Sequence, residues 1–127
     1  PGDELTIVTW GATVEKSLRA AEVAAEREGI ETEVIDLRTI APWDHDLVAQ
    51  SVARTSRVLV VHEDTLTGGF GGEVAAWIGE HCFGDLDAPV RRLAATDTWV
   101  AYEPTLEEAI LPQVDDITAA IVDLASS

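Results

Sequence analysis

Two stretches of the sequence combine residue types that can do chemistry. In His62-Glu63-Asp64, a histidine beside carboxylates could act as a general base. Adjacent residues of a strand point to opposite faces, so Glu63 would not orient the His62 imidazole, and a structural histidine at a sheet edge is favoured. Residues 68–72 read Gly-Gly-Phe-Gly-Gly, and backbone N–H groups there could cradle a phosphate. No Lys-Ser or Lys-Thr follows and carboxylates flank the stretch, so a structural turn or a close contact with another backbone is favoured.

The other nucleophilic and basic side chains do not combine into a site. His81 and Cys82 adjoin in a stretch with helical periodicity, where successive side chains diverge by about 100°. That divergence separates a nucleophile from its base. No two histidines have the spacing of metal ligands, and no G-x-S-x-G motif occurs. We therefore predict no catalytic, cofactor-binding or metal-binding residue in this chain, and catalysis by His62 is the weaker hypothesis.

Strands and helices are expected to alternate along the chain. Apolar and β-branched residues predict strands at residues 5–10, 32–37, 57–62 and 90–95. The four consecutive aliphatic residues 58–61 are typical of a strand that is buried on both faces. The alternation favours an α/β fold with three layers, α/β/α, around a mainly parallel sheet of about five strands. In such a sheet, functional residues gather at the carboxyl ends of the strands.

Periodic apolar residues predict the helices that cover this sheet. Thr13 and Asp44 are expected to cap the first two helices, Gly29 to end the first, and residues 105–108 to begin a short one. The side chains expected to face the sheet are Val14, Leu18, Ala21 and Ala25, then Leu47, Val48 and Val52, then Val74, Trp77, Ile78 and Cys82, and finally Val114, Ile117, Ile121 and Leu124.

Composition favours one globular domain with a strong negative charge. The 127 residues are 46% hydrophobic, carry a formal net charge of −16 and contain no linker, so we expect a single domain over residues 1–127. The charge would repel nucleic acids and anionic membranes but can attract a basic protein. The longest aliphatic run is too short to span a bilayer. The single cysteine favours the cytoplasm, and a start at Pro1 without any methionine favours a piece of a longer protein.

Five segments, taken in order, resemble one known family: residues 5–11, 33–44, 62–70, 87–93 and 97–112. They are similar to the transketolase C-terminal domain of the β subunit of 2-oxo acid dehydrogenase E1. The motif Val-Ile-Asp-Leu-Arg-Thr-Ile-x-Pro-Trp-Asp in the second segment is specific for that subunit, and His-Glu-x-x-Leu-Thr-Gly-Gly-Phe in the third resembles branched-chain enzymes more than pyruvate enzymes. Relatives often have Asp-Thr-Pro-x-Pro-Tyr where the fifth segment has Asp-Thr-Trp-Val-Ala-Tyr, so two stiffening prolines are absent here.

The resemblance implies an α2β2 heterotetramer, an oxidoreductase that decarboxylates a 2-oxo acid and passes the acyl group to a lipoyl group on E2. Thiamine diphosphate and Mg²⁺ would bind between the α subunit and the amino-terminal domain of β, which is expected to be missing here. By resemblance, the present domain binds neither cofactor alone, is inactive by itself and serves assembly. Its partners would be the E1 α subunit, a second β subunit and the basic subunit-binding domain of E2, which the net charge of −16 suits.

The residues expected to form subunit interfaces lie in the loops at the strand ends and in the glycine-rich stretch. They are His62, Glu63, Thr67, Gly68, Gly69, Phe70, Gly71, Gly72, Trp43, Trp99 and Tyr102. Large aromatic residues at such places belong either to the rim of the core or to an interface. The alternative hypothesis is a free-standing flavodoxin-like module that binds a ligand or regulates through the same edge of the sheet.

Overall fold

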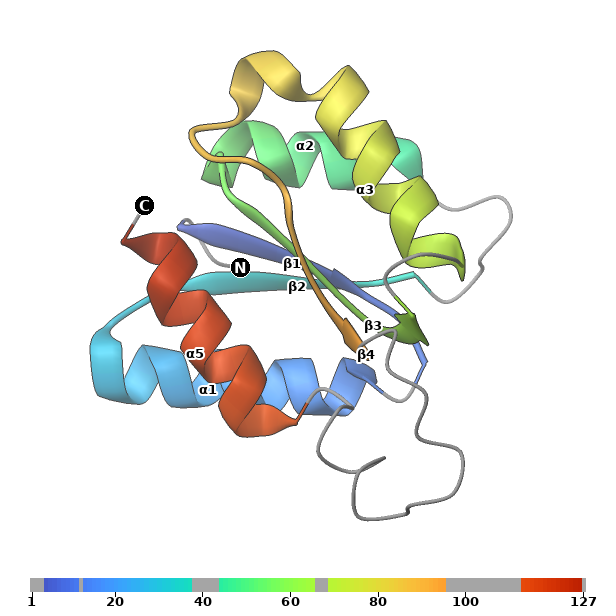
Figure 1. The fold of residues 1–127 in the computed structure, drawn as a ribbon. Helices are drawn as coiled ribbons and strands as arrows, with labels where there is room; N and C mark the ends of the chain where they lie inside the picture. The colour runs from blue at the N-terminus through green and yellow to red at the C-terminus, as the bar shows by residue number, and fades with distance from the viewer. Residues whose placement is uncertain (1–3, 12, 38–43, 66–68, 96–112, 127) are drawn as a thin grey trace, which may run out of the picture.

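The computed structural model describes residues 4–11, 13–37, 44–65, 69–95 and 113–126. Its strands are β1 (Leu5–Thr9), β2 (Thr32–Asp36), β3 (Val58–Thr65) and β4 (Arg91–Ala95). They form one parallel sheet in the order β2-β1-β3-β4 (Figure 1). The predicted α/β class and parallel sheet are confirmed, and the 4 strands of the described residues come close to the predicted number.

Helices cover both faces of this sheet. They are α1 (Thr13–Glu28), α2 (His45–Thr55), α3 (Gly69–His81) and α5 (Val114–Ala125), and a short 3-10 turn, η1 (Phe83–Asp85), follows α3. In Figure 1, α2 and α3 lie on one face of the sheet, whereas α1 and α5 lie on the other. The predicted three layers are therefore confirmed. Residues 105–108, predicted to begin a helix, lie outside the described residues.

The central strand β3 is buried between the two helical layers. Val58 and Val60 belong to the core cluster on the side of α2 and α3, whereas Leu59 and Val61 belong to the cluster on the side of α1 and α5. All four side chains are fully buried, as the run of aliphatic residues predicts. The strand extends beyond its predicted end at His62, so this histidine lies within the strand.

The buried face of α1 is rotated by one residue from the predicted one. The buried side chains are Thr13, Ser17, Ala20 and Ala24, and not Val14, Leu18, Ala21 and Ala25. Leu18 is 52% exposed. Small side chains let the helix approach the strands closely. The Thr13 hydroxyl, predicted to cap the helix, donates instead to the backbone carbonyls of Trp10 and Val61. Gly29 follows α1 in the left-handed conformation, with a φ of 69°, as predicted for its end.

The start of α2 follows the prediction, but its buried face does so only in part. The Asp44 carboxylate accepts a hydrogen bond from the Leu47 amide at 3.0 Å and caps the helix. Val48 and Val52 are fully buried, whereas Leu47, predicted to face the sheet, is 46% exposed. Polar residues of α2 that hydrogen-bond to β1 complete the inner face.

Helix α3 begins inside the glycine-rich stretch. Gly69 is its first residue, so residues 69–72 are helical and do not form the predicted turn. The predicted inner faces of α3 and α5 are confirmed. Their buried side chains are Val74, Ile78 and Cys82 along and just after α3, and Ile117, Ile121 and Leu124 in α5. Trp77 and Val114 are partly buried and pack against the same two clusters.

Candidate functional site

Hydroxyl hydrogen bonds close the carboxyl end of β1. The Thr13 hydroxyl lies 2.8 Å from the carbonyl oxygen of Trp10 and 3.3 Å from that of Val61 in β3. The hydroxyl oxygens of Thr9 and Thr13 are 2.7 Å apart. This cluster fixes the start of α1 between β1 and β3, where the connections of the sheet run in opposite directions. These contacts hold the end of β1 against the start of α1 and against β3.

His62 lies inside β3 and is fully buried. Its ring stacks on the Trp10 indole, with the centroids 5.4 Å apart and the planes 8° from parallel. A buried imidazole that packs against an indole is typical of a structural histidine. Because its side chain is fully buried, His62 does not contact a partner directly and could affect an interface only by positioning residues at the surface.

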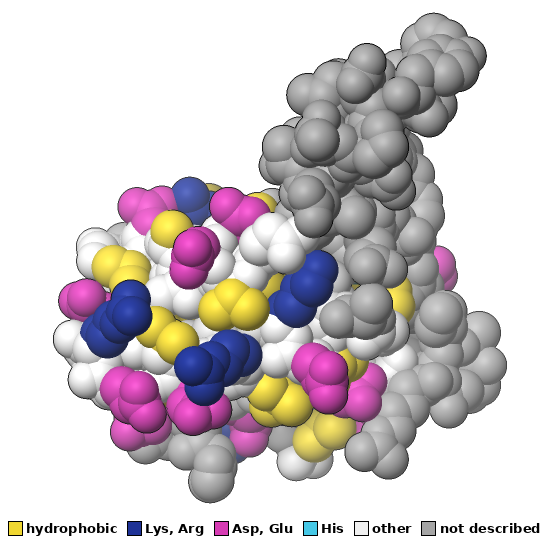
Figure 2. All heavy atoms as spheres, turned by 90° about the horizontal axis from the view of Figure 1, so that it is seen from below, with side chains coloured by type: hydrophobic (Ala, Val, Ile, Leu, Met, Phe, Trp, Pro, Cys, Tyr) yellow, Lys and Arg dark blue, Asp and Glu magenta, His cyan; other side chains and the backbone are white. Residues whose placement is uncertain are grey.

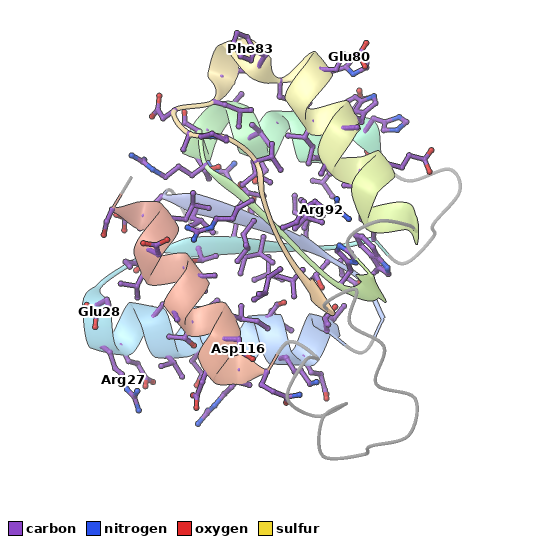
Figure 3. The ribbon with its side chains drawn as sticks, viewed as in Figure 1. Arg27, Glu28, Glu80, Phe83, Arg92 and Asp116 are labelled. Atoms are coloured by element: carbon purple, nitrogen blue, oxygen red, sulfur yellow. The ribbon has the colours of Figure 1, made fainter. Side chains whose placement is uncertain are left out.

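Only some of the other predicted interface residues are among the described residues. Trp43, Thr67, Gly68, Trp99 and Tyr102 lie outside the described residues, whereas Glu63 belongs to β3 and Gly69, Phe70 and Gly71 belong to the start of α3. Gly72 faces β4, because a Cβ on it would lie 3.7 Å from the Arg92 guanidinium. Arg92 lies beneath α3 in Figure 3. The structure thus brings the first turns of α3 close to β4.

A polar network that the sequence analysis did not anticipate joins α2 to β1 and β2. The Thr6 hydroxyl of β1 lies 2.7 Å from the Ser51 hydroxyl and 2.6 Å from the Thr55 hydroxyl. Ser51 donates to the Glu33 carboxylate of β2 at 2.5 Å, and Arg54 donates to the same oxygen at 2.5 Å. All three hydroxyl side chains are buried. The network fixes the position of α2, but none of its groups is placed to act on a substrate.

The charge of Glu33 makes this network sensitive to acid. Burial raises the pKa of Glu33, but hydrogen bonds from Ser51 and Arg54 and the charge of Arg54 outweigh it, so the pKa lies below the usual 4.5. A pKa that is lower in the folded state stabilises the fold above the unfolded value, and this stabilisation is lost as the pH falls through the folded pKa.

We expect Glu33→Gln to remove this acid dependence. At pH 7 the variant should lose about 1 kcal/mol of unfolding free energy, because a partly exposed charged hydrogen bond is replaced by a neutral one. The difference from wild type should shrink as the pH falls below about 4.5. Urea denaturation between pH 7 and pH 3 measures both, with Glu28→Gln on the exposed side of α1 as the control. If the difference in unfolding free energy between wild type and Glu33→Gln stayed constant with pH, the lowered pKa of Glu33 would be contradicted.

An aromatic stack connects the beginning of α2 with the end of α3. The Trp77 indole lies between two imidazoles, with its centroid 4.7 Å from that of His45 and 4.6 Å from that of His81. Both histidines are exposed, whereas Cys82 is buried. The side chains of His81 and Cys82 therefore diverge, as predicted. Burial, followed by the charge of Asp85, raises the pKa of the Cys82 thiol. An inert thiol turned away from the histidine does not form a nucleophile–base pair.

A shallow groove lies near the amino-terminal ends of the strands, opposite the predicted edge. It measures about 650 Å³ and is formed by the end of α3, by η1 and by residues 86–90 before β4. Phe83 borders it and is 77% exposed. We refer to it as the Phe83 groove. Its walls are mainly glycine, alanine, proline and aliphatic residues, which carry no chemistry that a sequence motif would reveal.

Neither a metal centre nor a membrane span is found in the part of the chain that the structure describes. Within these residues, no three His, Cys, Asp or Glu side chains converge as a metal ion would require. No described helix is both long and apolar enough to cross a membrane. On the face formed by α1 and α5, positive and negative side chains lie among hydrophobic ones (Figure 2). That face thus shows no large area of a single charge.

The chain matches a known protein family over most of its length. The model of the C-terminal domain of transketolase matches residues 1–117. The chain belongs to the transketolase C-terminal domain family. This membership agrees with the three-layer fold and with the family that the sequence motifs indicate.

The relatives of this family member include β subunits of two dehydrogenases. The β subunit of 2-oxoisovalerate dehydrogenase from Bacillus subtilis (strain 168) is 43% identical over 125 residues, which are 98% of this chain and 38% of that protein. The β-1 subunit of the mitochondrial pyruvate dehydrogenase E1 component from Arabidopsis thaliana is 44% identical over 119 residues, 94% of this chain and 32% of that protein.

A solved structure of a split-gene transketolase, an inactive beta4 tetramer, has the same fold. It matches with a TM-score of 0.82 and 28% identity, over 99% of this chain and 39% of that one. The chain therefore spans less than 40% of the length of each of these three relatives.

Proposed function

We propose that the chain is the C-terminal assembly domain of the β subunit of a thiamine diphosphate-dependent 2-oxo acid dehydrogenase E1. The observation that carries this proposal is the similarity to two dehydrogenase β subunits over 98% and 94% of the chain. The intact enzyme would oxidatively decarboxylate a 2-oxo acid and transfer the acyl group to the lipoyl group of E2. This domain would supply subunit contacts and have no activity alone.

Thiamine diphosphate and Mg²⁺ belong, in this proposal, to the intact enzyme. The cofactor supplies the electron sink for decarboxylation when it is bound. Two observations support placing both groups outside this domain: the hydroxyls at the end of β1 bond to one another and to backbone carbonyls, and no three metal-ligating side chains converge among the described residues. In this proposal, the preceding thiamine-binding domain of the subunit carries the chemical steps.

The substrate that we favour is a branched-chain 2-oxo acid. The support is the His-Glu-x-x-Leu-Thr-Gly-Gly-Phe segment at residues 62–70, which resembles branched-chain enzymes more than pyruvate enzymes. The 2-oxoisovalerate and pyruvate dehydrogenase relatives are 43% and 44% identical to this chain, so overall identity does not separate the two substrates.

The proposed partners are the E1 α subunit, a second β subunit and the basic subunit-binding domain of E2, in the cytoplasm. The net charge of −16 supports the last of these, because an acidic surface steers a basic partner toward it. Assembly into an α2β2 heterotetramer would use the predicted residues at the strand ends and at the start of α3. The start of α3 near Gly72 and the end of β3 are the described parts of that surface.

Native mass spectrometry of the chain with E1 α and with the E2 subunit-binding domain tests the proposal. We expect complexes with these proteins and self-association of the β domain. Phe70→Asp and Gly71→Arg, at the start of α3, should abolish the contacts between E1 subunits. Leu18→Asp is the control, because Leu18 is half exposed on α1 on the other side of the sheet.

Each result of this experiment has one meaning. If wild type forms no complex with any of the three partners, the proposed function is wrong. If wild type assembles and the two α3 variants assemble equally well, the subunit interface lies elsewhere on the domain. Loss of assembly in the Leu18 control alone would instead assign the interface to the α1 face.

The alternative of a flavodoxin-like binding module rests on the strand order β2-β1-β3-β4. In such sheets, ligands bind where the connections diverge, here between β1 and β3. A titration of the chain with nucleotides and flavins distinguishes the two functions. We expect no binding, because the Thr9 and Thr13 hydroxyls at that position bond to each other and to the Val61 carbonyl. A saturable isotherm would favour the module.

A further inference from the structure

The net charge of the chain is large for its size. The 127 residues include 24 acidic side chains and 8 basic ones, which gives a formal net charge of −16. A net charge of about 2–8 is enough to keep a small domain soluble. A much larger charge destabilises the compact state, because folding brings side chains of the same sign closer together.

Exposed carboxylates lie on each of α1, α2, α3 and α5. In Figure 3, Glu28 lies at the end of α1, Glu80 on the outer side of α3 and Asp116 near the start of α5. These three side chains are exposed, and the exposed Asp46 adds a charge on α2. The negative charge is therefore present on both helical layers. A basic partner would neutralise only the part of it that it covers.

The basic side chains of the chain compensate few of these carboxylates. The ion pairs among the described residues are Arg19–Glu22, Arg54–Glu33, Arg57–Asp87 and Arg91–Asp123. In the same part of the chain, the exposed carboxylates that form no ion pair include Glu15, Glu26, Glu28, Asp46, Glu73 and Glu80. Ions from the solution must therefore compensate most of this charge.

The salt concentration decides how far these carboxylates repel one another. The Debye length is about 10 Å at 0.1 M salt and about 3 Å at 1 M. A domain of this length has a radius of gyration of about 14 Å. At 0.1 M, carboxylates on different helices therefore still repel one another, whereas at 1 M only adjacent side chains do.

We infer that the folded chain depends on salt at about molar concentration, with monovalent cations screening the carboxylates on its four helices. These ions take the place of basic side chains that the sequence lacks, since Lys16 is its single lysine. Screening requires no specific binding site. The inference concerns the stability of the fold and does not depend on the proposed function, because it would hold equally for a free-standing module.

Thermal unfolding of the chain at pH 7, followed by circular dichroism between 0.1 and 2 M KCl, tests this inference. We expect the melting temperature to rise by roughly 10 °C or more over this range. Most of the rise should occur below about 1 M, where the Debye length shortens most. NaCl should act like KCl, because screening does not select between these cations. A melting temperature that stays constant with salt would overturn the inference.

Charge variants separate screening from a general effect of salt on the burial of apolar surface. Glu26→Gln/Glu73→Gln/Glu80→Gln removes three exposed carboxylates and changes the net charge from −16 to −13. This triple variant should melt several degrees higher than wild type at 0.1 M KCl and at the same temperature as wild type at 2 M. Arg27→Gln removes an exposed cation of α1 and should melt lower than wild type at 0.1 M only.

Gln50→Ala is the matched control, because it changes an exposed side chain of α2 without changing the net charge. Its melting temperature should rise with salt by as much as that of wild type. If the triple variant and Arg27→Gln also rise by as much as wild type, salt acts through apolar burial and the inference is wrong. If KCl stabilises the chain and NaCl does not, a specific cation site replaces the inferred screening.

Discussion

Replacing Leu59 by alanine is expected to lower the free energy of unfolding by about 2–5 kcal/mol. Leu59 is fully buried in β3 and belongs to the cluster that the strands form with α1 and α5. Ile117 and Ile121 belong to the same cluster, and the central strand cannot move toward them without losing its pairing with β1 and β4. A cavity should therefore remain after the truncation. Urea denaturation at pH 7 measures the loss.

Leu47→Ala is the matched control for this prediction, since it removes the same atoms from a side chain that is 46% exposed. Its loss should stay below about 1 kcal/mol, because less apolar surface leaves the protein interior. Equal losses for the two variants would contradict the orientation of α2, in which Val48 and Val52 face the sheet and Leu47 does not. The comparison therefore tests the core and the corrected helix face together.

The parts of the fold that follow from the sequence are those with the strongest apolar signal. The run of aliphatic residues 58–61 has no polar alternation, and only a strand covered on both faces buries it completely. The spacing of Ile117, Ile121 and Leu124 likewise leaves one possible inner face for α5. Once strands and helices alternate, each helix carries the chain back across the sheet, so that consecutive strands run parallel.

The helix faces that were predicted wrongly are those where polar residues are buried. On α1, the stripe that contains Leu18 is more apolar than the stripe of Thr13, Ser17, Ala20 and Ala24, yet the second one faces the sheet. A hydroxyl can replace an apolar side chain in a core when a distant residue offers a hydrogen bond. The Thr13 hydroxyl has two local partners, the Thr9 hydroxyl at 2.7 Å and the Trp10 carbonyl at 2.8 Å. It also lies 3.3 Å from the carbonyl of Val61, 48 residues away, and this contact is one that no local pattern in the sequence reveals.

The candidate site shows the same limit. Sequence patterns single out histidines, acidic residues and glycine repeats as candidate functional residues. His62 is such a candidate, but in the structure its ring is buried against Trp10. The Phe83 groove escapes notice because small residues form it, and their importance depends on how α3, η1 and the segment before β4 meet. Phe83 beside Gly84, followed by acidic residues, is the one signal in the sequence that could have indicated an exposed surface.

The strongest test of the buried polar network is Thr6→Val, which should cost about 1–3 kcal/mol although the two side chains have almost the same shape. The Thr6 hydroxyl is the shared partner of Ser51, at 2.7 Å, and of Thr55, at 2.6 Å. Without it, two buried hydroxyls keep only their contacts to Glu33 and to the Arg57 carbonyl. The loss should therefore exceed that of an ordinary single hydrogen bond.

Removing a second hydroxyl separates this explanation from a simple loss of packing. In Thr6→Val/Thr55→Val, no hydroxyl of Thr55 remains to be satisfied, so the double variant should lose less than the sum of the two single variants. Urea denaturation at pH 7 of the four proteins in this cycle gives the coupling energy, which we expect to be about 1 kcal/mol. Additive losses would mean that the hydroxyls act independently. In that case the position of α2 would depend on its apolar contacts through Val48 and Val52, which are fully buried, and not on the network.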